Sequence, residues 1–187
     1  SHFGRGLTPQ RHIGPCRICG EKTMTNIMIQ KTHLVCPHCN ATNRVPSDKL
    51  QAELNCGKCH AALLQAHPDN LGEAAFNAQL AKSDLPLVVD FWAPWCGPCL
   101  QFAPTFKEAS EKIEGVTFAK VNTEEEQSLG AHFGIRSIPT LMIFRETIGI
   151  FSQPGSMTAK DLEDLLSKAK SIDMDEVRKE LENQEQA

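Results

Sequence analysis

Short apolar runs bounded by polar residues predict the strands of a sheet in the second half of the chain. The runs at residues 87–91 and 116–121 have the length of buried strands. Residues 140–144 and 148–152 are two further runs that a three-residue turn separates, which is the pattern of a hairpin. A small strand at residues 63–64 is a candidate to precede them. These runs predict a sheet of at least four strands.

Apolar residues at helical spacing occur between these runs. Residues 71–82 and 100–114 each place apolar side chains on one helical face, and Pro104 is expected to kink the second helix. Thr123 and Glu126 have capping-box spacing, which predicts a helix over residues 123–133, and a last helix begins at Thr158. The order of helices and strands predicts an α/β fold, a mixed sheet covered by helices on both faces.

Charge divides the chain near residues 60–70. The chain has 187 residues and a formal net charge of −4, which argues against a general nucleic-acid binder. Residues 1–60 carry eight basic and three acidic residues, a balance of +5, whereas residues 61–187 carry 11 basic and 20 acidic residues, a balance of −9. No apolar run reaches the roughly 18 residues of a membrane helix, and the first ten residues lack a signal-peptide core.

All eight cysteines occur in Cys-x-x-Cys pairs, namely Cys16/Cys19, Cys36/Cys39, Cys56/Cys59 and Cys96/Cys99. A secreted disulfide scaffold usually scatters its cysteines at varied spacings. Four close pairs without an isolated thiol indicate metal and redox chemistry in a reducing compartment, so we expect a cytoplasmic protein.

The pair at Cys96 and Cys99 lies between the predicted strand at 87–91 and the helix that follows it. Unpaired N–H groups and the dipole at the start of this helix favour an anion, so Cys96 is the expected nucleophilic thiolate. Cys99 lies one turn later and can attack a mixed disulfide formed on Cys96. Gly97 and Pro98 permit the tight entry into the helix.

Three segments in this order resemble the thioredoxin family. They are Asp90 to Cys99, with the sequence DFWAPWCGPC; Phe118 to Asn122; and Gly134 to Thr140, with the sequence GIRSIPT. The resemblance covers about residues 69–170 and implies a thioredoxin fold. One difference from the family is the turn at residues 145–147, which replaces an Asn-Gly hairpin turn.

The resemblance also implies roles for single residues. Pro139 would follow a cis peptide bond beside the cysteine pair. Asp90 would be buried with a raised pKa and would take the proton of Cys99, with Lys120 nearby to modulate it. A cap or a solvent-facing position is the alternative for Asp90, and its apolar run disfavours both. The substrate-docking surface would be formed by Trp95, Ile138 and Gly155.

The cysteines before residue 60 have the spacing of a structural zinc site. Cys36, Cys39, Cys56 and Cys59 form a Cys-x2-Cys-x16-Cys-x2-Cys pattern. Cys16 and Cys19 with Cys36 and Cys39 have the same spacing, so spacing alone leaves both sets open. The segment Asn40 to Pro46 resembles the ribbon of the zinc-bearing bacterial thioredoxin subgroup, called thioredoxin 2, and this favours the first set.

The expected organisation is therefore a flexible extension at residues 1–30, a zinc ribbon at 31–65, a thioredoxin domain at 69–170 and a solvated acidic helical tail at 171–187. The purpose of Cys16/Cys19 stays open. So does the origin of the extension, since Ser1-His2 fits an expression remnant and Met24 fits a native start.

The expected function is reduction of protein disulfides by a monomeric electron carrier with structural or redox-regulatory Zn²⁺. The resemblance implies recharging by a flavin-containing thioredoxin reductase that uses NADPH. Alternatives are a zinc-binding chaperone or adaptor without turnover, and a disulfide oxidase or isomerase; Pro98 between the cysteines favours a reductant. Membrane binding is not expected, and without aromatic residues interleaved among its basic residues the ribbon is not expected to bind nucleic acid.

Overall fold

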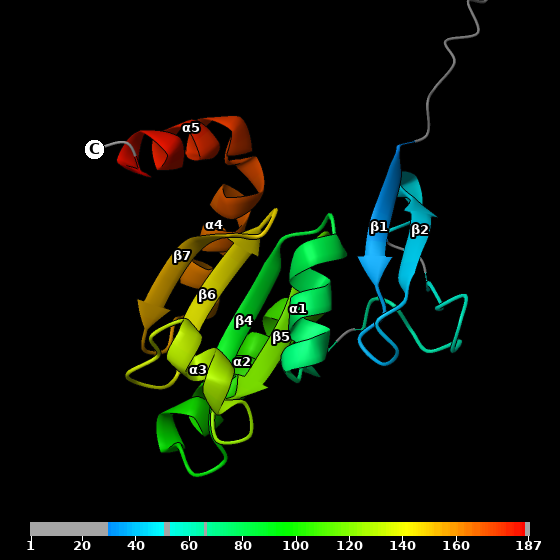
Figure 1. The fold of residues 1–187 in the computed structure, drawn as a ribbon. Helices are drawn as coiled ribbons and strands as arrows, with labels where there is room; N and C mark the ends of the chain where they lie inside the picture. Colours follow the sequence, from blue (N-terminus) through cyan, green and yellow to red (C-terminus); the bar gives the residue numbers. More distant parts are fainter. Residues whose placement is uncertain (1–29, 51–52, 66, 186–187) are drawn as a thin grey trace, which may run out of the picture.

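The computed structural model describes residues 30–50, 53–65 and 67–185 and contains two sheets (Figure 1). The first is a two-stranded antiparallel sheet of β1 (Lys31–Val35) and β2 (Thr42–Pro46), followed by the short 3-10 helix η1 (Ser47–Lys49). A small buried cluster supports it: Leu34, Cys36, Val45, Cys56 and Leu63. Cys16 and Cys19 lie outside the described residues.

The second sheet has five strands in the order β3-β5-β4-β6-β7. These strands are β3 (Asp69–Asn70), β4 (Leu87–Trp92), β5 (Thr117–Asn122), β6 (Thr140–Arg145) and β7 (Ile148–Pro154). Strands β3, β5 and β4 pair in parallel, whereas β6 and β7 are antiparallel to their neighbours. The predicted mixed sheet and hairpin are confirmed. The expected strand at residues 63–64 was wrong, because the strand that pairs with β5 is β3.

Helices cover both faces of this sheet, as predicted. These are α1 (Glu73–Lys82), α2 (Gly97–Lys112), α3 (Gln127–His132) and α4 (Ala159–Ser171), and a further helix, α5 (Met174–Glu185), follows them. Phe76 of α1 and Leu129 of α3 pack in the same buried cluster as Val89 of β4. Phe106 of α2 and Leu166 of α4 pack in another cluster with Val88. Because neighbouring residues of a strand point to opposite faces, α1 and α3 cover one face and α2 and α4 the other.

The expected start of the helix at Thr123 was wrong, because α3 begins at Gln127 and no side chain of Glu126 caps it. Both side chains of the predicted capping box instead form hydrogen bonds with segments distant in the sequence. The Thr123 hydroxyl donates to the main-chain oxygen of Trp92 (3.2 Å). The Glu126 carboxylate accepts from the N–H of Glu73 (3.0 Å) at the start of α1. The cap at Thr158 is confirmed, since its hydroxyl accepts from the N–H of Asp161 (3.2 Å).

The turn between β6 and β7 places Glu146 and Thr147 at positive φ, 48° and 72°. Helix α5 lies beyond this end of the hairpin (Figure 1) and contacts it through an ion pair between Arg178 and Glu146 (2.5 Å). Most of α5 is exposed, as expected of a solvated tail, but Met174 is buried. No helix within the described ranges is both long and apolar enough to cross a membrane.

Strand β1 lies alongside α1 (Figure 1), and the edge of β1 that does not pair with β2 bonds to the five-stranded part. The amide of Gln79 donates to the main-chain oxygen of Val35 (2.8 Å), and this bond is buried. The N–H of His33 donates to the carboxylate of Asp84 (2.7 Å), whose own N–H donates to the His33 oxygen (3.0 Å). These bonds fix the two-stranded sheet to α1 and to the loop after it.

Candidate redox-active site and metal centre

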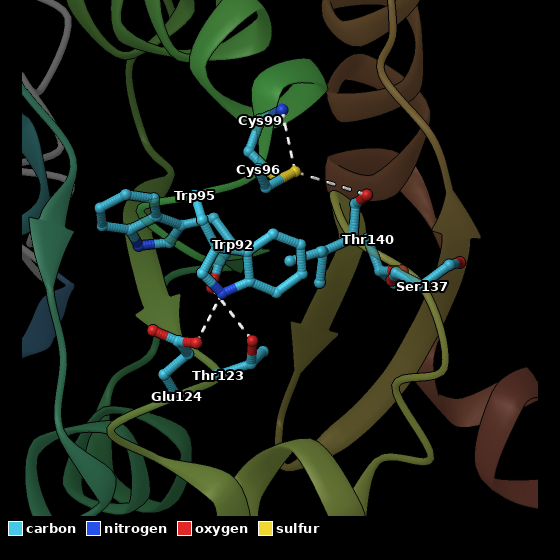
Figure 2. The surroundings of a disulfide bond; sticks show 9 residues. Trp92, Trp95, Cys96, Cys99, Thr123, Glu124, Ser137 and Thr140 are labelled. Carbon is cyan, nitrogen blue, oxygen red and sulfur yellow. Dashed lines mark hydrogen bonds between the residues drawn. A yellow bond between two sulfur atoms is a disulfide. The ribbon is translucent and has the colours of Figure 1, made fainter.

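Cys96 and Cys99 form a disulfide at the N-terminus of α2 (Figure 2). Cys96 is the N-cap residue, and its sulfur accepts a hydrogen bond from the Cys99 N–H (3.2 Å). Gly97 and Pro98 form the first two positions of the helix, where a missing N–H costs nothing. When the pair is reduced, the free N–H groups and the helix dipole favour a thiolate at Cys96.

The loop before β6 lies against this disulfide. The Ile138–Pro139 peptide bond is cis, which confirms the expectation for Pro139. The Ile138 oxygen lies 3.6 Å from the Cys96 sulfur, and Ile138 packs on the buried cluster of Ala93, Cys96 and Cys99. The N–H of Gly155, a residue at φ 98°, donates to the Pro139 oxygen (2.8 Å). The fold therefore brings Ile138, Pro139 and Gly155 together beside the cysteine pair.

Asp90 lies on β4 and is fully buried, with 0% of its surface exposed. It points to the same face as Val88, the face that α2 covers, because side chains two residues apart share a face. Neither carboxylate oxygen has a hydrogen-bond partner among the described residues. Burial raises the pKa of Asp90 from 3.8 to about 7, and the positive charge of Lys120 opposes this shift. Asp90 can therefore gain and lose a proton near neutral pH.

Lys120 is the register partner of Asp90 on the neighbouring parallel strand β5. Its ammonium lies 4.0 Å from the centre of the Trp92 ring. Burial lowers the pKa of Lys120, and the Asp90 carboxylate raises it in return. Trp92 thus forms a cation–π contact with Lys120, a residue of the candidate site.

Trp95 is 68% exposed beside the disulfide. Its indole N–H donates to the carboxylate of Glu124 (2.5 Å), and the N–H of Glu124 is held by the side chain of Asn122 (3.1 Å), so the ring has a fixed position (Figure 2). Sequence reasoning missed Glu124. The acidic run at residues 124–126 was read as the start of a helix, and no local signal shows that Trp95 folds against it.

Cys36, Cys39, Cys56 and Cys59 meet in the two-stranded part, with all four sulfurs within 4.8 Å of one another. Cys36 and Cys59 have their sulfurs 3.5 Å apart, and Cys39 and Cys56 have theirs 3.6 Å apart. Tetrahedral Zn²⁺ with bonds of about 2.3 Å needs sulfur separations of about 3.8 Å. The donor set fits zinc in number, chemistry and spacing.

The four thiols also differ in their surroundings. Burial raises the pKa of Cys36 to about 12. Hydrogen bonds from the N–H groups of Cys59 and Lys58 lower the pKa of Cys56 to about 6. A divalent cation in their midst would favour the thiolate form of all four.

Asn43 connects the two cysteine pairs and was not singled out from the sequence. Its amide nitrogen lies 3.6 Å from the Cys56 sulfur and donates to the Ala41 oxygen (3.0 Å). Its side-chain oxygen accepts from the N–H of Gly57 (2.9 Å). Because Ala41 follows the first pair and Gly57 lies within the second, Asn43 fixes one relative to the other. The sequence placed Asn43 in the segment Asn40 to Pro46 that resembles a zinc ribbon, but that resemblance gave the residue no role of its own.

A cysteine pair at a helix N-terminus, beside a cis-proline and on a mixed sheet with helices on both faces, defines the thioredoxin class of fold. The sequence model of thioredoxin matches residues 68–168, more than half of the chain. The chain therefore belongs to the thioredoxin family, whose members are thiol–disulfide oxidoreductases. A second model, described as "Thioredoxin 2, N-terminal", matches residues 35–61. This match contains Cys36 to Cys59, the ligand set that the sequence resemblance favoured.

Known proteins agree with this assignment. The chain is 42% identical over 135 residues to Thioredoxin C-3 of Corynebacterium nephridii, covering 72% of this chain and 93% of that one. It is 48% identical over 99 residues to a Streptomyces coelicolor protein named "Putative thioredoxin 2", covering 53% and 74%. Among solved structures, a mutant thioredoxin from Halobacterium salinarum matches with a TM-score of 0.53 and 26% identity, covering 58% and 95%.

Proposed function

We propose that this thiol–disulfide oxidoreductase reduces protein disulfides through Cys96 and Cys99, with Asp90 as the proton acceptor. The observation that carries the proposal is the position of Cys96 at the N-cap of α2, beside the cis-proline loop. That position favours a thiolate. Trp95, Ile138 and Gly155 form the docking surface for an extended segment of a target.

In the first step the Cys96 thiolate of the reduced protein attacks one sulfur of the target disulfide. A bond forms between Cys96 and that sulfur while the target's S–S bond breaks. The second target sulfur leaves as a thiolate and takes a proton from water. The product is a mixed disulfide between Cys96 and the target.

In the second step Cys99 loses its proton to the Asp90 carboxylate, and its thiolate attacks the Cys96 sulfur. The Cys96–Cys99 bond forms while the bond to the target breaks, and the released target sulfur leaves as a thiolate that takes a proton from water. Asp90 then returns its proton to water. Asp90 suits this role because burial raises its pKa to about 7, so it accepts a proton near neutral pH. Lys120 modulates this affinity by stabilising the carboxylate. Two electrons and two protons have then passed to the target.

The oxidised protein must be reduced again, and the chain itself supplies no reductant. We assign this step to a flavin-containing thioredoxin reductase that draws electrons from NADPH, as in other thioredoxins. A reductant of this kind works in a reducing compartment, which favours the cytoplasm. A monomer is sufficient, because every proposed reacting group lies on one chain.

The zinc centre is proposed to be structural. Four thiolates from Cys36, Cys39, Cys56 and Cys59 would fill a tetrahedral ion and leave no position for a substrate. The metal supplies the stability that the small cluster around Leu34 and Val45 cannot supply alone.

Reduction of insulin by NADPH and thioredoxin reductase tests the function. We expect catalytic amounts of the wild-type protein to support turnover and Cys96→Ser to abolish it. The reduction potential of the pair should lie near the roughly −270 mV of thioredoxin. Full turnover by Cys96→Ser would reject the assignment. A potential near the roughly −120 mV of an oxidant such as DsbA would replace it with oxidase activity.

A further inference from the structure

The chain segment around the start of α2 carries no charge. No charged residue occurs from Phe91 to Phe106, although charged residues make up 22% of the chain. Part of this segment faces the core, where Phe102 and Phe106 are buried. Its exposed residues are Pro94, Trp95, Gly97, Pro98, Leu100, Gln101 and Pro104. This uncharged surface surrounds the Cys96–Cys99 pair.

Leu100 stands out on this surface because it is large, apolar and 54% exposed. Its N–H donates to the Cys96 oxygen (3.1 Å), which places Leu100 one helical turn beyond Cys96. Residues four positions apart lie on the same side of a helix. Leu100 therefore lies on the same side of α2 as Cys96, and Trp95 directly precedes Cys96 in the chain. Among the described residues only one other large hydrophobic side chain, Leu181 on α5, is classed as exposed.

We propose that Leu100 determines specificity by receiving an apolar side chain next to the cysteine of the target disulfide. This inference rests on the proposed function. The occupant is an extended segment of a disulfide-bearing protein, because the target must bring a sulfur to Cys96. The residues that flank the target cysteine then cross the surface on either side of Cys96, where Trp95 and Leu100 stand. The docking surface of Trp95, Ile138 and Gly155 thus continues along α2.

The Trp95 ring is held before a target arrives by its hydrogen bond to Glu124, and the main chain of Leu100 is held by the first full turn of α2. A preorganised apolar surface loses little conformational freedom on binding. An apolar neighbour of the target cysteine gains stability by covering Leu100, whereas a charged neighbour finds no partner between Phe91 and Phe106.

Two peptides test the proposal. Each carries one cysteine in a mixed disulfide with glutathione, flanked by leucines in one peptide and by serines in the other. The second-order rate constant for reduction of each peptide by the reduced protein is measured in single turnover. The ratio of the two constants reports specificity alone, because both peptides meet the same thiolate.

We expect the wild-type protein to prefer the leucine peptide and Leu100→Gln to lower the ratio about fivefold. Leu100→Met should keep most of the preference. Leu181→Gln, the same exchange on α5, should leave the ratio at the wild-type value. A wild-type ratio near one, or an unchanged ratio in Leu100→Gln, would overturn the proposal and leave the proposed function intact. Failure of the wild-type protein to reduce either peptide would instead overturn both.

Discussion

Asp90 and Lys120 are register partners on parallel strands, yet the carboxylate is buried without a hydrogen bond among the described residues. Because burial raises the pKa of Asp90 to about 7, the stability of the fold depends on pH. The folded protein binds a proton at Asp90 between about pH 4 and pH 7 that the unfolded chain releases. Stability therefore falls as pH rises through this window, and the buried charge destabilises the fold above pH 7.

The change Asp90→Asn removes this charge with almost no change in volume. We expect it to raise the free energy of unfolding at pH 8 by roughly 2–4 kcal/mol, and the gain to shrink toward zero near pH 4. Urea unfolding of the oxidised protein at both pH values measures this. An equal effect at pH 8 and pH 4 would contradict the pKa assignment. The same variant should slow release of the target from the mixed disulfide.

Cys99→Ser separates the two proposed chemical steps. The Cys96 thiolate still attacks the target, but no second thiol releases it, so the mixed disulfide accumulates. Non-reducing electrophoresis and mass spectrometry after incubation with a disulfide protein should show a covalent complex that dithiothreitol breaks. The double variant Cys96→Ser/Cys99→Ser is the matched control and should form none. A complex attached to any other cysteine would argue against Cys96 as the nucleophile.

Asn43→Ala tests the organisation of the metal centre. The change removes the bonds to Ala41 and Gly57 and the contact with Cys56. Since loss of a residue that orients ligands typically weakens a metal site 10–100-fold, we expect a drop of about that size in Zn²⁺ affinity. Competition with a chromogenic chelator measures it. Asn77→Ala, at an exposed position of α1, is the control. Equal affinities would show that Asn43 does not support the site.

Thr147→Gly tests strain in the β6–β7 turn. A β-branched residue at φ 72° is disfavoured, whereas glycine adopts this conformation readily. After allowance for the greater freedom of glycine in the unfolded chain, we expect a gain of about 0.5–1 kcal/mol in stability. The converse change, Gly115→Ala, has the same φ of 72° and no atom within 4 Å of the added methyl group. It should lower stability by about 1 kcal/mol in the same thermal unfolding measurement.

The chemistry of the cysteine pairs could be predicted from sequence because it depends on neighbours in the chain. A strand followed by a helix places Cys96 at the N-cap whatever surrounds it, and the two Cys-x-x-Cys turns bring two sulfurs each. Four of the five strands of the central sheet could also be predicted, since they follow apolar runs such as residues 87–91. The exception is β3, Asp69–Asn70, whose two polar residues give no such signal.

Features that depend on contacts between distant segments could not be predicted. The buried residues of α1 are Phe76 and Gln79, and the polar Gln79 is buried because its amide bonds to Val35 of the ribbon. The helix after β5 starts late because Thr123 and Glu126 bond elsewhere. The cis bond before Pro139 came from family resemblance, since only about 5–6% of such bonds are cis.

Side chains from α1 and from the loop after it cover the edge of β1 that does not pair with β2. Gln79 and Asp84 occupy the main-chain groups of His33 and Val35 that a further strand could use. An uncovered edge of this kind is a template for aggregation, and Asp84 offers its carboxylate and its own N–H much as a neighbouring strand would. The contacts with Gln79 and Asp84 thus protect the ribbon from edge-to-edge pairing, and a ribbon cut free after residue 65 would expose this edge to its own copies.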